Sequence, residues 1–209
     1  MRLPESRGLY DPRFEHDACG VGFVAHVRGL RSHDIVERGV GILLNLEHRG
    51  ATGCDPLSGD GAGILIQVPH ELLAAEVEGR FELPSPGTYG VGCVFLPRDP
   101  AARARCQQVL EDKILGTGQR LLGWRTVPVD EAALGPIARQ SAPVIFQVLV
   151  GSTTDDEQGF ERKLFVIRKW AERTVRESDI PGRDAFYIPS LSCRTLVYKG
   201  LLLAHQLAK

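Results

Sequence analysis

The stretch "HDACGVGFVAH" spans residues 16–26 and places Cys19 between an unpatterned lead-in and a run of small and apolar residues. Alternating apolar residues then predict a strand over 20–28, with Val21, Phe23, Ala25 and Val27 on one face. A cysteine that opens a strand most often packs in the core. It can instead act as a nucleophile if it is the first residue of the mature chain, because a terminal amine can act as the base for its own thiol. The residues alone leave both interpretations open.

Beyond this stretch, strands and helices follow one another without a strict β-α-β alternation, which favours an α+β fold over a doubly wound sheet. The apolar spacing predicts helices over 32–47, 70–80, 99–115 and 155–178. It predicts extended segments over 61–69, 88–97, 119–129, 144–151, 185–193 and 195–203. The last two are close enough in sequence to pair as a hairpin. The tail after 203 carries no cap or closing element, so we expect the fold to be incomplete at its C-terminal end.

Composition excludes several classes of protein. The 209 residues are 43% hydrophobic and carry a formal net charge of −1, which suits one globular domain and argues against a nucleic-acid binder. No apolar run approaches the roughly 18 residues that span a bilayer, so we expect no membrane partner. The five cysteines form no C-x-x-C pair, and residues 1–18 lack the apolar stretch of a secretory signal. These features favour a reducing compartment, the cytoplasm, and no metal site.

Two further motifs could carry chemistry. "LEHRGATG" (46–53) places Arg49 where a predicted helix ends, so its guanidinium could orient a carboxylate or simply pair with Glu47 or nearby carbonyl groups. "SGDGAGILIQ" (58–67) is rich in glycine but leads into a strand, whereas a phosphate-binding loop requires a helix N-terminus. We therefore expect a tight turn at Asp60 and Gly61 and no nucleotide site.

Three segments together resemble a known family: "GLYDPRFEHDACGVGFVAH", "NLEHRGATGCDPLSGDGAGILIQVPH" and "FYIPSLSCRTLVYKGLLLAHQL". They are similar to the class II glutamine amidotransferase domain that begins the large subunit of glutamate synthases. That domain is an N-terminal-nucleophile hydrolase with a four-layer αββα sandwich. The resemblance covers nearly the whole chain.

The resemblance implies specific roles. Residues 1–18 would be a propeptide, and 19–209 the N-terminal part of the amidotransferase domain. Cys19 would be the nucleophile, with its freed α-amine as the base, and would attack the side-chain amide of L-glutamine. Arg49 would order the nucleophile region, and Asp60 and Gly61 would line the site.

The resemblance also implies partners and cofactors. The partners would be L-glutamine and the remainder of the large subunit, and a small electron-donating subunit is also compatible with it. FMN and an iron–sulfur cluster would belong to the full subunit, with no cofactor in this chain. The ammonia released would be transferred to 2-oxoglutarate.

The sequence also departs from the family. The family's Asn-Gly oxyanion pair is absent, since the single asparagine, Asn45, precedes Leu46. The arginine-phenylalanine-serine motif is also absent. We therefore expect the 209 residues alone to be nearly inactive, since one lost oxyanion donor costs about 10²–10³ in turnover. Two alternatives stay open at this point: a non-catalytic remnant or split-enzyme partner, and a class II amidotransferase that serves another acceptor.

Overall fold

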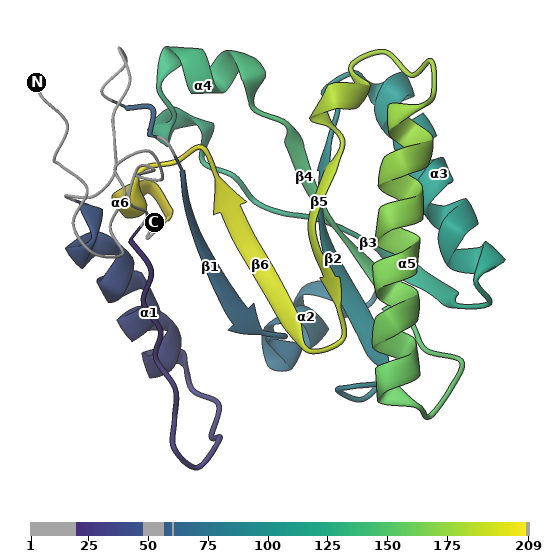
Figure 1. The fold of residues 1–209 in the computed structure, drawn as a ribbon, viewed down its shortest axis with the longest axis horizontal. Coiled ribbons are helices and arrows are strands. Elements are labelled where there is room, and N and C mark those ends of the chain that lie inside the picture. Colours follow the sequence, from purple (N-terminus) through teal and green to yellow (C-terminus); the bar gives the residue numbers. More distant parts are fainter. Residues whose placement is uncertain (1–19, 48–56, 60, 208–209) are drawn as a thin grey trace, which may run out of the picture.

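A computed structural model describes residues 20–47, 57–59 and 61–207 of the chain (Figure 1). The described helices and strands form a mixed architecture with two antiparallel sheets. In chain order they are α1 (His33–Asn45), β1 (Ala62–Gln67), α2 (His70–Val77), β2 (Tyr89–Leu96), α3 (Pro100–Gly116), β3 (Arg120–Thr126), η3 (Glu131–Ala133), α4 (Pro136–Ser141), β4 (Val144–Gly151), α5 (Glu157–Arg176), η4 (Arg183–Ala185), β5 (Tyr187–Ser192), β6 (Thr195–Gly200) and α6 (Ala204–Leu207).

Four strands form the larger sheet in the order β3-β4-β2-β5, and α3 and α5 cover one of its faces (Figure 1). Helix α3 begins with Pro100 in its first turn, where Asp99 caps it by accepting a 2.7 Å hydrogen bond from Ala102 N. Helix α5 buries the predicted apolar stripe, which consists of Phe160, Leu164, Ile167, Ala171 and Val175. Each large apolar side chain buried here contributes about 1.5–3 kcal/mol to folding, so this helix layer holds the main core.

The second sheet pairs β1 with β6 and lies against the other face of the larger sheet. A second apolar core fills the space between the two sheets, with α2 at its edge; its buried members are Val68, Leu73, Tyr89, Val91, Cys93, Leu149 and Leu196. Helix α1 lies outside this sheet beside β1 (Figure 1). A Cβ on Gly39 would lie 3.1 Å from Ile64 Cδ1, so the glycine in α1 allows close packing against the strand.

A polar network crosses the layer between the sheets. The Arg125 guanidinium on β3 donates to Glu76 Oε2 on α2 at 2.8 Å and to Gln147 Oε1 on β4 at 2.9 Å. Gln147 in turn donates from Nε2 to the Tyr198 hydroxyl on β6 at 2.9 Å. Burial raises the pKa of Tyr198, so its hydroxyl stays neutral and available for this bond. The network fixes the smaller sheet against the larger one.

Three sequence-based expectations about elements are wrong. Residues 20–26 form no strand, and among the described residues no strand lies alongside to pair with their backbone groups. Strands β5 and β6 do not form a hairpin, because β5 pairs with β2 while β6 crosses to β1. The tail contains the short helix α6, which the sequence pattern did not indicate.

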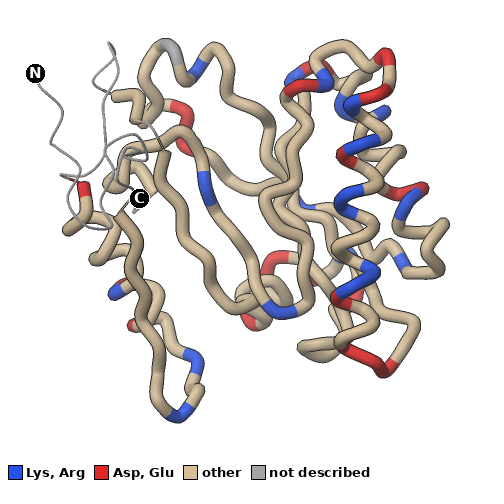
Figure 2. Tube along the Cα trace, in the orientation of Figure 1, with Lys and Arg blue, Asp and Glu red and all other residues tan. Residues whose placement is uncertain are grey.

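Charged residues of both signs are interspersed along α3 and α5, and the strands carry few of them (Figure 2). Helix α5 has Glu157 in its first turn and Arg173 and Arg176 in its last, which matches the helix dipole. Among the described helices, none has both the length and the apolar character needed to cross a bilayer.

Candidate functional site

The expected site residues Cys19, Arg49 and Asp60 lie outside the described residues, whereas Gly61 lies within them. Their sequence neighbours are described, and these show which parts of the chain meet. Gly20 follows Cys19, α1 ends shortly before Arg49, and Gly59 and Gly61 flank Asp60.

Gly59 packs tightly against the chain that follows β6, and Gly61 is in ordinary contact with the end of β6. A Cβ on Gly59 would lie 2.8 Å from the carbonyl oxygen of Leu202, closer than real Cβ contacts come. Gly61 has φ of +129°, a conformation that favours glycine, and a Cβ there would lie 3.4 Å from Gly200 O. As expected from the sequence, the glycine-rich segment leads into a strand, β1, and not into a helix.

The end of α1 meets both the start of the described chain and α6. A Cβ on Gly20 would lie 3.0 Å from Leu46 Cβ, so the residue after Cys19 packs against the C-cap of α1. One residue further on, Glu47 Oε1 lies 2.8 Å from His205 Nδ1 on α6. The segment that leads into the His-Arg-Gly motif is thus held between Gly20 and α6.

Gln206 on α6 uses its whole side-chain amide. Its Nε2 donates to Leu57 O at 3.0 Å and to Ala133 O at 2.7 Å, while its Oε1 accepts from Leu203 N at 2.8 Å. The C-terminal stretch 200–206 therefore contacts the chain at Glu47, Leu57, Gly59 and Gly61. The described flanks of all three sequence motifs converge at this end of the molecule.

A groove of about 1050 Å³ begins at Gly20. It runs between residues 20–33, α1, β1 and the start of α2, and it is lined mainly by apolar side chains. Val21 and Phe23 are 88% and 90% exposed on its wall. Its polar lining includes Arg31, Gln67, His70, Glu71 and Thr195. The volume suffices for a small-molecule substrate next to the start of the described chain.

The three described cysteines are poor nucleophiles. Cys93, Cys106 and Cys193 are all buried, and burial raises the pKa of Cys93 and of Cys193 to about 12 and that of Cys106 above its usual value. A neutral thiol reacts slowly, because the thiolate is the attacking species. They also do not fit an iron–sulfur cluster, since no three potential ligands meet anywhere in the described part of the chain. The described cysteines therefore do not compete with Cys19 as the expected nucleophile.

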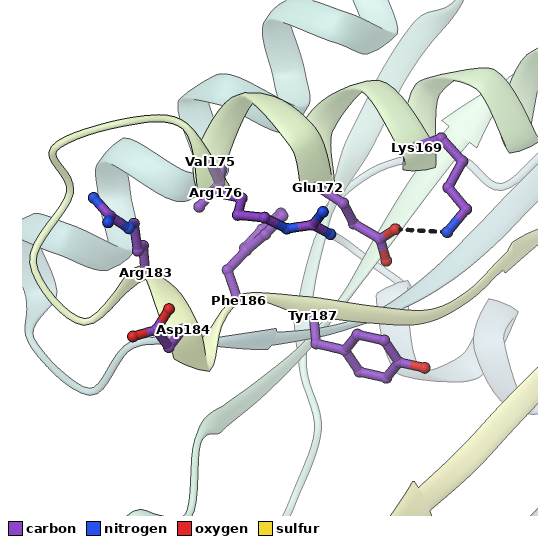
Figure 3. Close-up of a pocket in the computed structure, with 8 residues that line it drawn as sticks. All are labelled: Lys169, Glu172, Val175, Arg176, Arg183, Asp184, Phe186 and Tyr187. Atoms are coloured by element: carbon purple, nitrogen blue, oxygen red, sulfur yellow. Dashed lines mark hydrogen bonds and ion pairs between the residues drawn. The ribbon is translucent and has the colours of Figure 1, made fainter.

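A smaller hollow of about 310 Å³ lies beside α5, η4 and β5, on the other side of the molecule from α6 (Figures 1 and 3). Figure 3 shows the Arg176 side chain extending toward Glu172, which pairs with Lys169 at 3.2 Å. Arg183 donates to Ser178 O. Both cations and carboxylates line its wall, so this hollow does not present a single sign of charge to a ligand.

Comparison with known proteins identifies the family of the chain. The sequence model of the family "Glutamine amidotransferases class-II" matches residues 19–209. The chain belongs to the class II glutamine amidotransferases. The match covers all four expected site residues and begins at Cys19 itself.

Relatives at the sequence level are glutamate synthases. The chain is 46% identical over 208 residues to the glutamate synthase (NADPH) large chain of Bacillus subtilis, covering 98% of this chain and 13% of that protein. It is 40% identical over 216 residues to the glutamate synthase (NADH) of Saccharomyces cerevisiae, covering 98% of this chain and 10% of that protein. It is 39% identical over 193 residues to the ferredoxin-dependent glutamate synthase 2 of Synechocystis, covering 90% of this chain and 12% of that protein. The chain thus spans only a small share of these relatives.

The sequence motifs did not single out α6. His205 and Gln206 stand at the end of "FYIPSLSCRTLVYKGLLLAHQL", a segment that carries the family resemblance but gives neither residue a role, and they lack a helix cap. Their contacts reach Glu47 and Leu57, about 150 residues away in sequence. No local pattern carries that information.

Proposed function

We propose that this chain forms part of a glutaminase site that hydrolyses L-glutamine to glutamate and ammonia. The observation that carries the proposal is the convergence of the segments flanking Cys19, Arg49 and Asp60 at one end of the molecule. Membership of the class II glutamine amidotransferases supports the same reaction.

In the proposed reaction, the Cys19 thiol gives its proton to the α-amine of the same residue, and the sulfur attacks the side-chain amide carbon of glutamine. The amine returns the proton to the departing nitrogen, so ammonia leaves and a thioester remains. Water then hydrolyses the thioester, which releases glutamate and restores the thiol. This chemistry requires a free amine at Cys19, so residues 1–18 are proposed to be a propeptide.

Supporting roles follow from position in the chain. Arg49 is proposed to order the region of the nucleophile, and Asp60 and Gly61 to line the site. The fold is proposed to be the N-terminal part of a four-layer αββα sandwich. The packing of α3 and α5, the larger sheet, the smaller sheet and then α1 is compatible with that arrangement.

The larger setting is proposed from the relatives. The released ammonia would be added to 2-oxoglutarate elsewhere in a glutamate synthase, where FMN and an iron–sulfur cluster would act. Partners would be the remainder of the large subunit and a small electron-donating subunit, in the cytoplasm. The 209 residues alone, which lack an Asn-Gly pair, are expected to hydrolyse glutamine only at background rate.

Replacing the proposed nucleophile tests the function directly. In the native polypeptide, made from its complete coding sequence, Cys19→Ala should reduce ammonia release from glutamine to background. Cys54→Ala is the matched control and should keep the activity, because the proposal gives that thiol no role. Activity that survives Cys19→Ala, or that is lost only with Cys54→Ala, would rule out the proposed mechanism.

A further inference from the structure

We propose that α6 is a positioning element for the glutaminase reaction, through His205 and Gln206. The inference rests on the proposed function and adds residues that no sequence motif assigns. It starts from one geometric fact: α6 contacts the chain on both sides of the His48-Arg49-Gly50 motif, at Glu47 before it and at Leu57 after it.

The two contacts differ in chemistry. His205 Nδ1 donates to the Glu47 carboxylate across 2.8 Å, and both side chains are about half exposed. Gln206 Nε2 donates to the Leu57 carbonyl, and its second N–H holds Ala133 at the end of η3. Because Gln206 Oε1 also accepts from Leu203 N, the amide is locked in one orientation. The Gln206 contact is therefore the more rigid of the two.

Steric contact reinforces these bonds. Leu202, just before α6, lies so close to Gly59 that a methyl group would not fit between them. Leu57 is thus held by Gln206, and Gly59 by Leu202. A segment whose two ends are fixed loses conformational freedom, so its residues reach a productive arrangement at lower entropic cost.

The test uses Gln206→Glu in the native polypeptide, because this change keeps the shape and the Oε1 acceptor but removes both N–H donors. Gln158→Glu makes the same chemical change at an exposed position on α5 and serves as the control. His205→Ala removes the second contact, and His205→Asn restores a donor near Nδ1. Amide hydrogen exchange of residues 46–59 and the kcat for glutamine hydrolysis are measured for each variant.

For Gln206→Glu, we expect exchange in 46–59 to rise about tenfold, as the loss of about one net hydrogen bond implies. We also expect kcat to fall about tenfold while exchange in β2, β4 and α5 stays unchanged. His205→Ala should act in the same direction to a smaller extent, with His205→Asn and Gln158→Glu close to wild type.

Unchanged exchange in 46–59, or an unchanged kcat despite faster exchange, would overturn the positioning role. If the wild-type protein itself hydrolyses no glutamine, the proposed function fails. The exchange data would then still decide whether α6 holds the two ends of the segment.

Discussion

Tyr198 contributes a single hydroxyl group to the polar network between the two sheets. The hydroxyl accepts the Nε2 hydrogen bond of Gln147, whose side chain is fully buried at 0% exposure. Water therefore cannot replace this acceptor. The cost of losing it should exceed that of losing a similar bond at the surface.

Replacing Tyr198 by phenylalanine should reduce the free energy of unfolding by about 1–3 kcal/mol, since a buried N–H is left without a partner. Tyr187→Phe is the matched control. Its hydroxyl accepts from Lys199 at the surface, so that change should stay within about 0.5 kcal/mol. Urea unfolding of both variants measures the difference. Equal effects would show that the network adds nothing to stability.

Some single-residue features near the site could be predicted from the sequence, and others could not. The sequence could indicate that Gly61 needs the conformational freedom of glycine, and its φ of +129° is one that other residues rarely adopt, whereas the turn expected at Asp60 lies outside the described residues. The contact of His205 with Glu47 was not predictable, because it depends on where two distant elements meet.

Helices α1 and α5 are both amphipathic, but they differ in how many side chains they bury. Helix α5 buries six residues, whereas α1 has no residue in the buried class. Helix α5 should therefore contribute more than α1 to the free energy of unfolding.

Two neighbouring substitutions on α5 test this. Leu164→Ala should lower the free energy of unfolding by about 2–5 kcal/mol, because Leu164 is fully buried and its loss leaves a cavity. Phe165→Ala, one position along and 58% exposed, should change it by less than about 0.5 kcal/mol. Urea denaturation compares the two, and a larger loss for Phe165→Ala would contradict the assigned buried face.

Sequence reasoning found helix α5 and strands β2 and β4, because each carries a long apolar pattern within its own residues. The pairing of β2 with β4 is not contained in those local patterns. The expected strand over 20–28 has the pattern but no partner strand among the described residues. For β5 and β6 the tight link suggested a hairpin, while the pairing with β2 and β1 is decided by tertiary packing.

At the scale of the whole molecule, burial is uneven. The larger sheet with α3 and α5 has a closed core, whereas the groove near Gly20 exposes apolar side chains, among them Val21, Phe23 and Leu65. Exposed apolar surface of this kind weakens cooperativity and favours association.

The 209-residue chain produced on its own should therefore unfold unevenly. Amides of α1 should exchange at least about tenfold faster than those of α5, because local opening of α1 exposes little apolar surface. Hydrogen exchange by mass spectrometry measures this directly, and a urea melt should be broad. Uniform protection with one sharp two-state transition would mean that these residues close their own core.

The central claim is that Cys19, as the first residue of the mature chain, is the nucleophile. The most direct measurement is peptide mass spectrometry of the native protein after reaction with an electrophilic glutamine analogue, 6-diazo-5-oxo-L-norleucine. We predict a chain that begins at Cys19 and carries one adduct on that residue, with the buried Cys93, Cys106 and Cys193 unmodified. A chain that retains residues 1–18, or an adduct on another cysteine, would contradict the account.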